Sequence, residues 1–381
     1  MTKKIIELDE LKRIMAVQKE YKENNKAITD ARRNSMNSKK AFPLGCNVRE
    51  DLYADLFTNG SVIKYPHGIV VQYGNNAPMK TFYRGEVKDY SRENSDLKCR
   101  SSLGRKLADL ENEEERVIEF FVGKLKIAAF TKLIQQIKQW SFGTIFTYII
   151  AQHYGIRTQY LDITDDLAVA LFFACCKSVG NGKYKPVSKK DIKEKDFGLH
   201  AVLYKRADDF MMNLDPDKKL RDVLPIGYQP FTRCYKQRGY FIDTQLYGDI
   251  VNYDLVKNHG FKKFYFKRTP EFSKEIYDLF DGGKKLFHDQ SMKLLSDVIN
   301  DIKEANSFSE DSFYSVYDIF GRDKPKDWWQ AKLSDYGIGI GETAFKLDDD
   351  LIAEIDDMWD IKEFVDQEGL AIGGRRVYYL E

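Results

Sequence analysis

One stretch near the middle of the chain limits the fold more than any other part of the sequence. Residues 151–176 read AQHYGIRTQYLDITDDLAVALFFACC, and polar side chains recur every few positions inside this apolar segment. The polar positions that stand out are His153, Thr158, Asp162 and Thr164. Burying an unpaired polar group costs roughly 1–3 kcal/mol, so these side chains must pair with one another or face a ligand.

The same stretch predicts a short buried strand followed directly by a helix. The strand is expected at YLDIT, where polar and apolar residues mix over five positions. The helix is expected to begin with Asp165 as its N-cap and to turn Ala168, Leu171 and Phe172 toward the core.

Residue spacing elsewhere predicts both helices and strands. Helices are expected at about 7–22, at 113–154 with a break at 141–143, and at 292–302. Strands are expected at GSVIKYPHGIVVQYG as a pair joined by a turn, and at MKTFYRGE, GLHAVLYKR, TRCYKQRGYFIDT and FKKFYFKR, the last as an edge strand. Because most strands come late and without long crossovers, we predict an α+β fold with a mixed, largely antiparallel sheet and flanking helices.

Charge and composition divide the chain into three segments. Residues 1–40 carry 11 Lys and Arg against 6 Asp and Glu, whereas residues 340–381 carry 4 against 12. We therefore predict an N-terminal helical and basic segment (1–59), a central domain (60–305) and an acidic α/β extension (306–381). A basic arm for nucleic acid and two solvated surfaces both fit the charge pattern. In the extension, Trp328 and Trp329 are expected to anchor packing rather than to stack on bases.

The overall composition is that of a globular protein without bulk affinity for polyanions. Hydrophobic residues make up 43% and the formal net charge is +1. The five cysteines form no C-x-x-C motif, which favours reduced thiols and a cytoplasmic location. The N-terminus has no apolar signal region, and no stretch approaches the ~18 apolar residues of a membrane helix, so no membrane partner is expected.

No familiar metal or cofactor motif is present in the sequence. The five histidines lie far apart, and H-E-x-x-H, the phosphate-binding P-loop and G-x-S-x-G are all missing, so we predict no metal. GIGIGE lacks the spacing of a phosphate-binding loop and is interpreted as a turn. The acidic run 348–350 is interpreted as a solvated helix start rather than a cation site.

The motif FYRGE at 82–86 is the first candidate for a binding site. Arg84 at the end of a strand can present its planar fork to a phosphate or carboxylate, while Gly85 would let a ligand approach the backbone. A surface arginine before a turn is the alternative. For His153 and Asp162 the alternatives are also structural: a hydrogen-bonded histidine at a helix end, and an aspartate paired with Arg84 or Arg105.

Five motif blocks occur in one order along the chain: FYRGE, CRSSLGR, AQHYGIRTQYLDITDDLAVALFFA, TRCYKQRGYFI and KKLFHD. Together they resemble the FRG domain family, and the resemblance covers about residues 60–305. It implies a shared core at Arg84, Gly85, Arg105, Gln152, His153, Tyr154, Gly155, Thr158, Leu161, Asp162, Arg233 and Gln237. The chain departs from the family's Pro-Thr-Arg by having Arg157, Thr158 and Gln159, so Arg157 is the candidate replacement for the missing cation.

The predicted order of elements is also similar to ADP-ribosyltransferase folds. That similarity implies NAD as the cofactor, with Arg84 holding its pyrophosphate or ribose and Asp162 and Thr164 on the supporting strand. Gln237 falls near the expected glutamate but cannot carry charge, so Glu86 or Asp162 would have to supply the carboxylate. We accordingly predict catalytic roles for Arg84, Asp162 and Gln237. Ligand-binding roles are predicted for Tyr83, Gly85, Arg105, Gln152, His153, Tyr154, Thr158, Thr164 and Arg233.

Three hypotheses about function follow from the sequence. The first is NAD-dependent ADP-ribosyl transfer or NAD hydrolysis in a toxin or phage-defence role, with a nucleotide ligand and a protein or nucleic-acid target. The second is a non-catalytic module that binds a nucleotide or nucleic acid and switches a partner. The third is an interaction protein in which the polar network only supports the fold.

Overall fold

The computed structural model describes residues 4–20, 61–65, 68–72, 80–89, 99–137, 147–180, 183–193, 199–208, 223–225, 232–247, 250–287, 293–342, 344–358 and 375–378. Cys46, His67 and His288 and the predicted helix break at 141–143 lie outside these residues.

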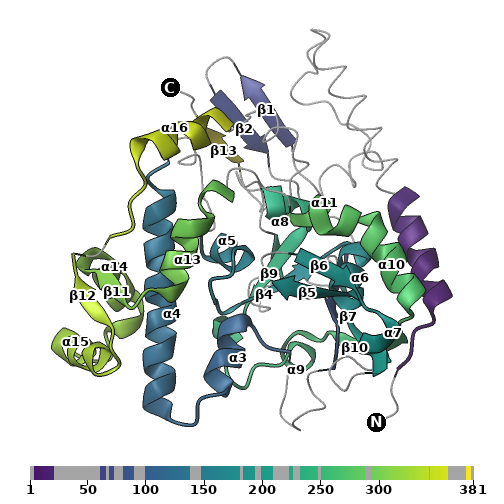
Figure 1. Ribbon diagram of the computed structural model, residues 1–381, viewed down its shortest axis with the longest axis horizontal. Helices are drawn as coiled ribbons and strands as arrows, with labels where there is room; N and C mark the ends of the chain where they lie inside the picture. The colour runs from purple at the N-terminus through teal and green to yellow at the C-terminus, as the bar shows by residue number, and fades with distance from the viewer. Residues whose placement is uncertain are drawn as a thin grey trace.

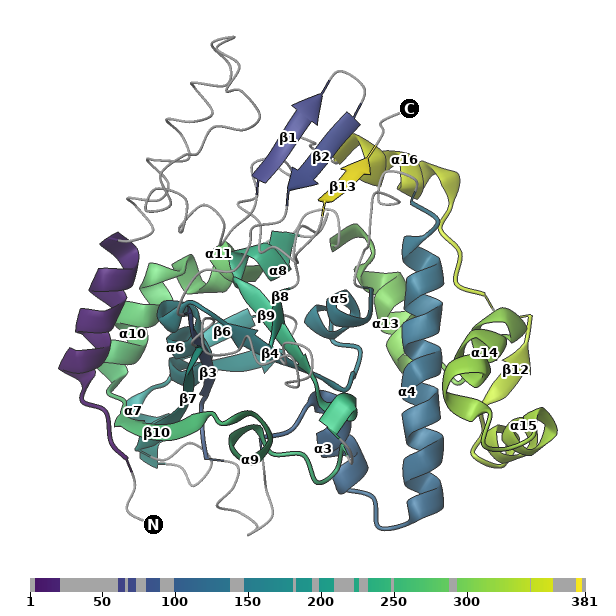
Figure 2. The same cartoon turned by 180° about the vertical axis from the view of Figure 1, so that it is seen from behind.

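Six strands form one central sheet in the order β10-β7-β3-β4-β9-β8 (Figures 1 and 2). They are β3 (Lys80–Glu86), β4 (Tyr160–Thr164), β7 (His200–Asp208), β8 (Leu224–Pro225), β9 (Gly239–Asp243) and β10 (Lys262–Lys267). All neighbouring strands in this order run antiparallel. The predicted α+β class is confirmed, and β10 lies at the edge as expected. The strand pairs of this sheet are all antiparallel, and Ile5 adds an isolated parallel bridge to Tyr265 of β10.

A single residue pair joins the two halves of this sheet. β3 pairs with β7 from end to end, and β4 pairs with β9 from end to end. Between β3 and β4 only Tyr83 and Thr164 are partners. Beyond that pair the two strands separate, so the sheet consists of two three-stranded halves with an opening between them.

The helix α6 (Leu167–Cys175) follows β4 and has Asp166, not Asp165, as its N-cap. The Asp166 Oδ1 accepts a hydrogen bond from the backbone N–H of Ala168 at 2.9 Å. Asp165 instead accepts from Nε and Nη2 of Arg238 at 2.5 and 3.0 Å. The prediction of Asp165 as the cap was wrong because two adjacent aspartates satisfy the same local pattern, and only the position of Arg238 separates their roles.

Gly85 lets α6 lie directly against β3. A Cβ atom at this position would be 1.8 Å from the carbonyl oxygen of Ala170. We expected Gly85 to leave room for a ligand, but the backbone of α6 fills the space at that Cβ position. Of the side chains predicted to face the core, Leu171 and Phe172 are fully buried, whereas Ala168 is only half-buried.

The remaining elements of the central part surround the sheet. They are α3 (Ser102–Ala108), α4 (Glu113–Ile134), α5 (Thr147–His153), β5 (Cys176–Gly180), β6 (Lys183–Pro186), α7 (Lys189–Lys193), α8 (Thr232–Lys236), η4 (Thr244–Tyr247), α9 (Leu255–His259), α10 (Pro270–Leu279), η5 (Asp281–Gly283), α11 (Lys284–Phe287) and α13 (Ser296–Glu304). The segment TRCYK was expected to be part of a strand but forms α8 before β9 begins. The predicted helix near 292–302 corresponds to α13.

The N-terminal helix covers residues 8–20, as predicted, and lies beside α10 (Figure 2). Leu11 is fully buried in the same hydrophobic cluster as α6 and α10. The Lys12 Nζ lies 2.7 Å from the Glu275 carboxylate of α10. This helix therefore packs against the central domain rather than standing apart from it.

The C-terminal extension packs against the long helix α4. Its elements are β11 (Ser307–Ser309), α14 (Glu310–Val316), the π-helical turn η6 (Tyr317–Gly321), α15 (Lys326–Asp335), β12 (Gly339–Gly341), α16 (Asp349–Met358) and β13 (Arg375–Tyr378). Trp329 is buried, stacks on Phe121 of α4 with ring centroids 4.1 Å apart, and donates from Nε1 to the Gly321 carbonyl at 2.8 Å. The prediction that this tryptophan anchors packing is confirmed, and the acidic run 348–350 begins α16 as expected.

A second sheet joins distant parts of the chain. β1 (Ser61–Tyr65) and β2 (Gly68–Gln72) form the predicted antiparallel pair, and β13 adds to β2. Within the described residues, no helix combines the length and the apolar character needed to cross a membrane.

Candidate functional site

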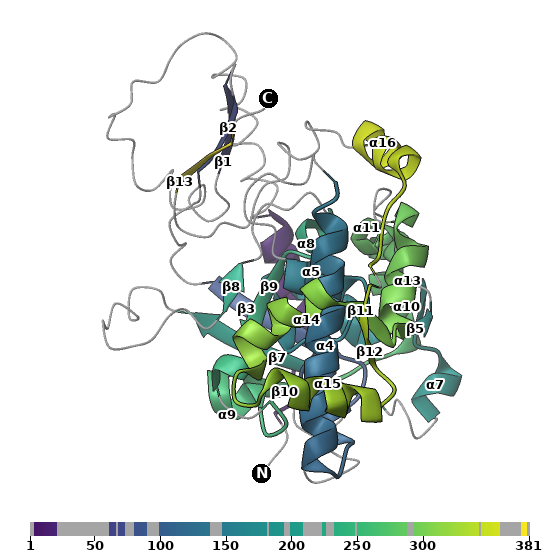
Figure 3. The same cartoon turned by 90° about the vertical axis from the view of Figure 1, so that its left-hand side faces the viewer.

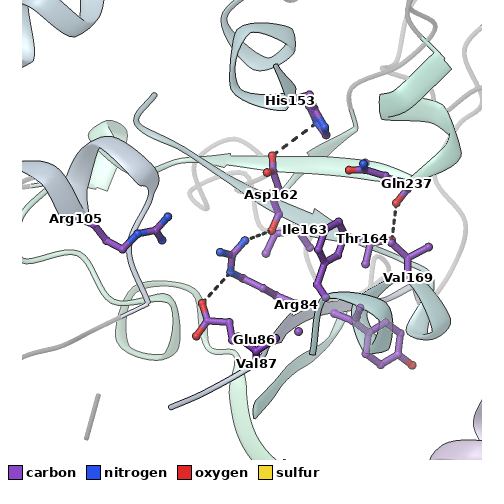
Figure 4. A pocket seen from close by; sticks show the side chains of 15 residues that line it. Arg84, Glu86, Val87, Arg105, His153, Asp162, Ile163, Thr164, Val169 and Gln237 are labelled. Atoms are coloured by element: carbon purple, nitrogen blue, oxygen red, sulfur yellow. Dashed lines mark hydrogen bonds and ion pairs between the residues drawn. The ribbon is translucent and has the colours of Figure 1, made fainter. Parts of the chain in front are cut away.

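A cleft with a cavity volume of about 310 Å³ opens where β3 and β4 separate. Figure 4 shows its walls, to which β3, β4, α3, α5 and α6 each contribute side chains. Eight of the twelve predicted site residues line it: Tyr83, Arg84, Gly85, Arg105, His153, Asp162, Thr164 and Gln237. The opening of the sheet thus gathers residues that are up to 154 positions apart, from Tyr83 to Gln237.

Arg84 spans the gap between the two half-sheets. Its Nη1 donates to the backbone carbonyl of Asp162 at 2.8 Å, and its Nε donates to Glu86 Oε1 at 3.3 Å. Burial is the largest single influence on the pKa of Arg84 and lowers it, but Cys99, Glu86 and Asp162 together outweigh burial and raise this pKa above its usual value. The guanidinium is therefore a fixed positive charge in the cleft, and it contacts the backbone of Asp162 rather than its carboxylate.

The side chains of His153 and Asp162 form an incompletely bonded pair. His153 Nε2 lies 3.8 Å from Asp162 Oδ1, which is beyond hydrogen-bond distance. Both atoms are buried, and neither has a hydrogen-bond partner in the described part of the chain. Burial lowers the pKa of His153 and Arg233 lowers it further, while Asp162 and Gln237 act in the opposite direction without reversing the shift. The imidazole is thus neutral at neutral pH and can exchange hydrogen bonds with a ligand.

Glu86 provides a second carboxylate in the cleft. Its side chain is 7% exposed, lies next to Arg84 and accepts a hydrogen bond from Cys99 Sγ at 3.4 Å. Sequence reasoning named Glu86 as one source of a carboxylate but could not place it. The period of two along a strand was the available signal, because it puts the side chains of residues 84 and 86 on the same face of β3.

Arg105 reaches the cleft from α3, and Figure 4 shows its guanidinium pointing toward Arg84 and Asp162. Its Nη1 donates to the backbone carbonyl of Arg100 at 2.9 Å. Because Arg105 is exposed while Arg84 is half-buried, the cleft has one arginine at its surface and one at its floor. Two arginines beside two carboxylates give the cleft mixed rather than uniform charge.

Two of the predicted residues, Thr164 and Gln237, connect the cleft walls to each other, and a third, Tyr83, is buried beside them. The Thr164 hydroxyl donates to the Gln237 carbonyl at 2.9 Å and accepts from the Asp166 backbone N–H at 3.1 Å. The side chain of Gln237 donates from Nε2 to the Leu286 carbonyl at 3.3 Å. Tyr83 is buried, and desolvation raises its pKa to about 12, so its phenol stays protonated at neutral pH. Thr164 and Gln237 therefore hold β4 and α8 together at the edge of the cleft.

Four predicted ligand-binding residues do not line the cleft: Gln152, Tyr154, Thr158 and Arg233. The Thr158 hydroxyl donates to Gln152 Oε1, and the Thr158 backbone N–H donates to Ser102 Oγ at 3.0 Å. Arg233 donates to the His153 carbonyl and lies over the Tyr154 ring at 4.3 Å from its centroid. These residues hold the segment that carries His153 in place, which is a supporting position behind the cleft.

The structure also shows where Arg157 and Gln159 lie, the two positions at which the chain departs from the family's Pro-Thr-Arg. Arg157 is 59% exposed, has Glu119 at 4.0 Å and does not line the cleft. Gln159 is buried, and its Oε1 accepts a hydrogen bond from Lys124 Nζ at 2.8 Å. The positive charge near position 159 therefore comes from α4 and not from Arg157.

The described residues contain no group of three or more His, Cys, Asp or Glu side chains placed to hold a metal ion. Cys99, Cys175, Cys176 and Cys234 are buried and are not part of a disulfide bond. For Cys175, desolvation raises the pKa to about 12, which disfavours the reactive thiolate. The chemistry available in the cleft is thus that of arginine, carboxylate, imidazole and amide groups.

The fold and the cleft together define an α+β protein with a divided antiparallel sheet, in which the cleft between the two halves has Arg84 at its floor. The sequence model of the FRG domain matches residues 79–182, which run from β3 through β5 and include both strands at the division. Residues 79–182 therefore match the FRG domain, the family that the motif blocks resemble. Arg233 and Gln237 fall outside the matched range. Comparisons with curated proteins and with solved structures gave no significant match.

Proposed function

We propose that the cleft binds NAD and cleaves the bond between its nicotinamide and ribose, by hydrolysis or by ADP-ribosyl transfer to an acceptor. The observation that carries this proposal is the position of Arg84 across the divided sheet, beside the unpartnered Oδ1 of Asp162. A fixed guanidinium suits a pyrophosphate, and an unpaired carboxylate oxygen suits the positive charge that develops on the ribose.

The reaction needs charge stabilisation more than proton transfer. The bond between ribose C1′ and the nicotinamide nitrogen breaks, and its electron pair moves to that nitrogen, which loses its positive charge. The ribose is left as an oxocarbenium-like ion, and water or an acceptor nucleophile adds at C1′ and releases a proton. A carboxylate close to such an ion stabilises it electrostatically.

The cleft residues fit separate parts of this substrate. Arg84 and Arg105 would contact the pyrophosphate, because an arginine fork pairs with phosphate oxygens in a bidentate manner. Asp162 Oδ1 and His153 Nε2, 3.8 Å apart, would receive a ribose hydroxyl between them. The apolar wall formed by Val169 and Phe173 would face the nicotinamide ring.

Gln237 would assist by hydrogen bonding alone. Its amide cannot take a proton or carry charge, and its Nε2 already donates to the Leu286 carbonyl. Asp162 is therefore the proposed catalytic carboxylate. Glu86, held by Arg84, is the proposed positioning group.

A toxin or defence role in the cytoplasm, with a protein or nucleic acid as acceptor, belongs to the same proposal. NAD cleavage depletes a cofactor of the whole cell, and transfer to a target inactivates that target, so either outcome suits an effector. Both outcomes release nicotinamide, which makes this product the most general readout.

The test measures nicotinamide released from NAD by purified full-length protein, with and without cell lysate as a source of acceptors. Asp162→Asn preserves the backbone carbonyl that Arg84 uses and should lower release by about 10²-fold. Arg84→Ala should lower it as well. Arg157→Ala is the matched control, because this exposed arginine does not line the cleft.

Absence of nicotinamide from wild-type protein under both conditions would refute catalysis. The alternative is then a non-catalytic nucleotide-binding module, which the amide of Gln237 in place of a carboxylate favours. Such a module should gain thermal stability with NAD or ADP-ribose, lose that gain in Arg84→Ala, and consume neither compound.

A further inference from the structure

A second cavity lies between α4 and the C-terminal extension and shares no lining residue with the cleft. Its volume is about 260 Å³, and its walls come from α4, α5, α14 and η6. Figure 3 shows α14 crossing in front of α4, against which it packs. The cavity therefore sits where the central domain and the C-terminal extension meet.

Lys124 forms part of this cavity and carries a buried charge without an acidic hydrogen-bond partner. The side chain is 2% exposed, and its Nζ donates to Gln159 Oε1 at 2.8 Å and to Gln245 Oε1 at 3.3 Å. Both acceptors are neutral amides. The rings of Phe320 and Phe120 lie 4.3 and 4.9 Å from the ammonium and compensate the charge only in part.

The electrostatic consequence is a low pKa. Burial lowers the pKa of Lys124 to about 8, and the more distant Asp243 only partly opposes this effect. Placing a buried ammonium among neutral acceptors is unfavourable, and an anion brought close to it would relieve that cost.

The lining of the cavity has the composition of an anion site with an apolar side. Two lysines, Lys124 and Lys132, contribute to it, and no aspartate or glutamate does. Asp311 lies 3.4 Å from Lys132, but this carboxylate is 84% exposed and is not part of the lining. The neutral hydrogen-bonding groups are Thr131, Gln135, Tyr148 and Ser315.

The opposite wall is apolar and irregular. It contains Val316, Ile319 and Phe320, and Ile319 is an exposed large hydrophobic side chain at 66%. Two of these residues lie in η6, a π-helical turn. Such turns are rare and occur frequently at functional sites.

We propose that this cavity binds a small organic anion, a carboxylate or phosphate attached to an apolar group, with Lys124 as its counter-charge. The anionic end contacts Lys124 and Lys132, and the apolar group lies against η6. This site is independent of the proposed NAD chemistry, because it shares no lining residue with the cleft.

The test uses benzoate, phenyl phosphate and acetate as probes and measures binding to the full-length protein by isothermal titration calorimetry and thermal shift. Benzoate or phenyl phosphate should bind more tightly than acetate, and the tighter of the two identifies the preferred anion. Lys124→Met should weaken binding by at least about tenfold. Lys274→Met is the matched control, because Lys274 is exposed and pairs with Asp278 on α10.

A second variant protects the test against misfolding. Ala128→Leu fills part of the cavity with a larger side chain from α4 and leaves Lys124 in place. It should therefore also weaken binding, while Lys274→Met should not. Equal affinity in wild type, Lys124→Met and Ala128→Leu would overturn the site, and so would absence of binding by all three probes to wild type. Equal affinity for acetate and benzoate would overturn the role of η6.

Discussion

Replacing Gly85 by alanine tests whether the glycine of the Arg-Gly motif serves packing. The new Cβ would be 1.8 Å from the Ala170 carbonyl oxygen and 3.1 Å from Ala174 Cβ, whereas Cβ contacts below 3.0 Å essentially never occur. The first of these neighbours is backbone in the middle of α6 and cannot turn away. The whole helix must therefore move off β3, which disturbs a core that includes Leu171 and Phe172.

We expect Gly85→Ala to lower the free energy of unfolding by about 3 kcal/mol or more, at the upper end for overpacked cores. Urea denaturation followed by tryptophan fluorescence measures this change. Gly341→Ala is the control, since a Cβ there meets no atom within 4 Å and should change stability by less than about 0.5 kcal/mol. A Gly85→Ala protein as stable as the control, but unable to bind a nucleotide, would refute the packing explanation and restore the ligand explanation.

Further substitutions test buried charges and a helix cap. The pKa of Lys124 is about 8 in the folded chain against 10.5 for an ordinary lysine, so the unfolded chain binds more protons between these pH values. Between pH 8 and 10.5 the free energy of unfolding of the wild type should therefore rise by up to about 3 kcal/mol relative to that of Lys124→Met. Denaturation at each pH measures both proteins, and parallel pH profiles would contradict the lowered pKa of Lys124. Asp165→Ala removes the carboxylate that Arg238 contacts and should cost about 3–5 kcal/mol. Asp166→Ala removes the helix cap and should cost about 1 kcal/mol. The reverse order in urea denaturation would show that Asp165 is the functional cap.

Local patterns in the sequence predicted most of the elements that the structure contains. The alternation in MKTFYRGE and GLHAVLYKR corresponds to β3 and β7, and the helical spacing near the N-terminus corresponds to residues 8–20. These patterns work because side-chain direction repeats every two residues in a strand and every 3.6 in a helix. The segment TRCYK failed because five residues are too few to show either period.

Pairing between distant strands could not be predicted in the same way. Nothing local indicates that β3 and β4 share only the pair Tyr83–Thr164, or that β13 joins β2 across some 300 residues of chain. Strand partners are selected by packing on both sheet faces and by the helices that cover them. That information is spread over the whole chain.

For the candidate site, the sequence by itself determined which side chains are unusual. Polar groups inside an apolar segment, an arginine before a glycine and the order of the motif blocks identified eight residues that line the cleft and the FRG domain that contains most of them. Burying a polar group without a partner is unfavourable, so polar residues inside an apolar segment can be recognised from the sequence alone.

Only the tertiary structure decided what each of these residues does. It placed Gly85 under α6, Glu86 beside Arg84, and Arg233 behind His153. It also brought Lys124 to Gln159 and left the His153–Asp162 pair unbonded. The physical reason is that a role depends on distance, burial and neighbouring charge, and these arise only when segments far apart in the sequence pack together.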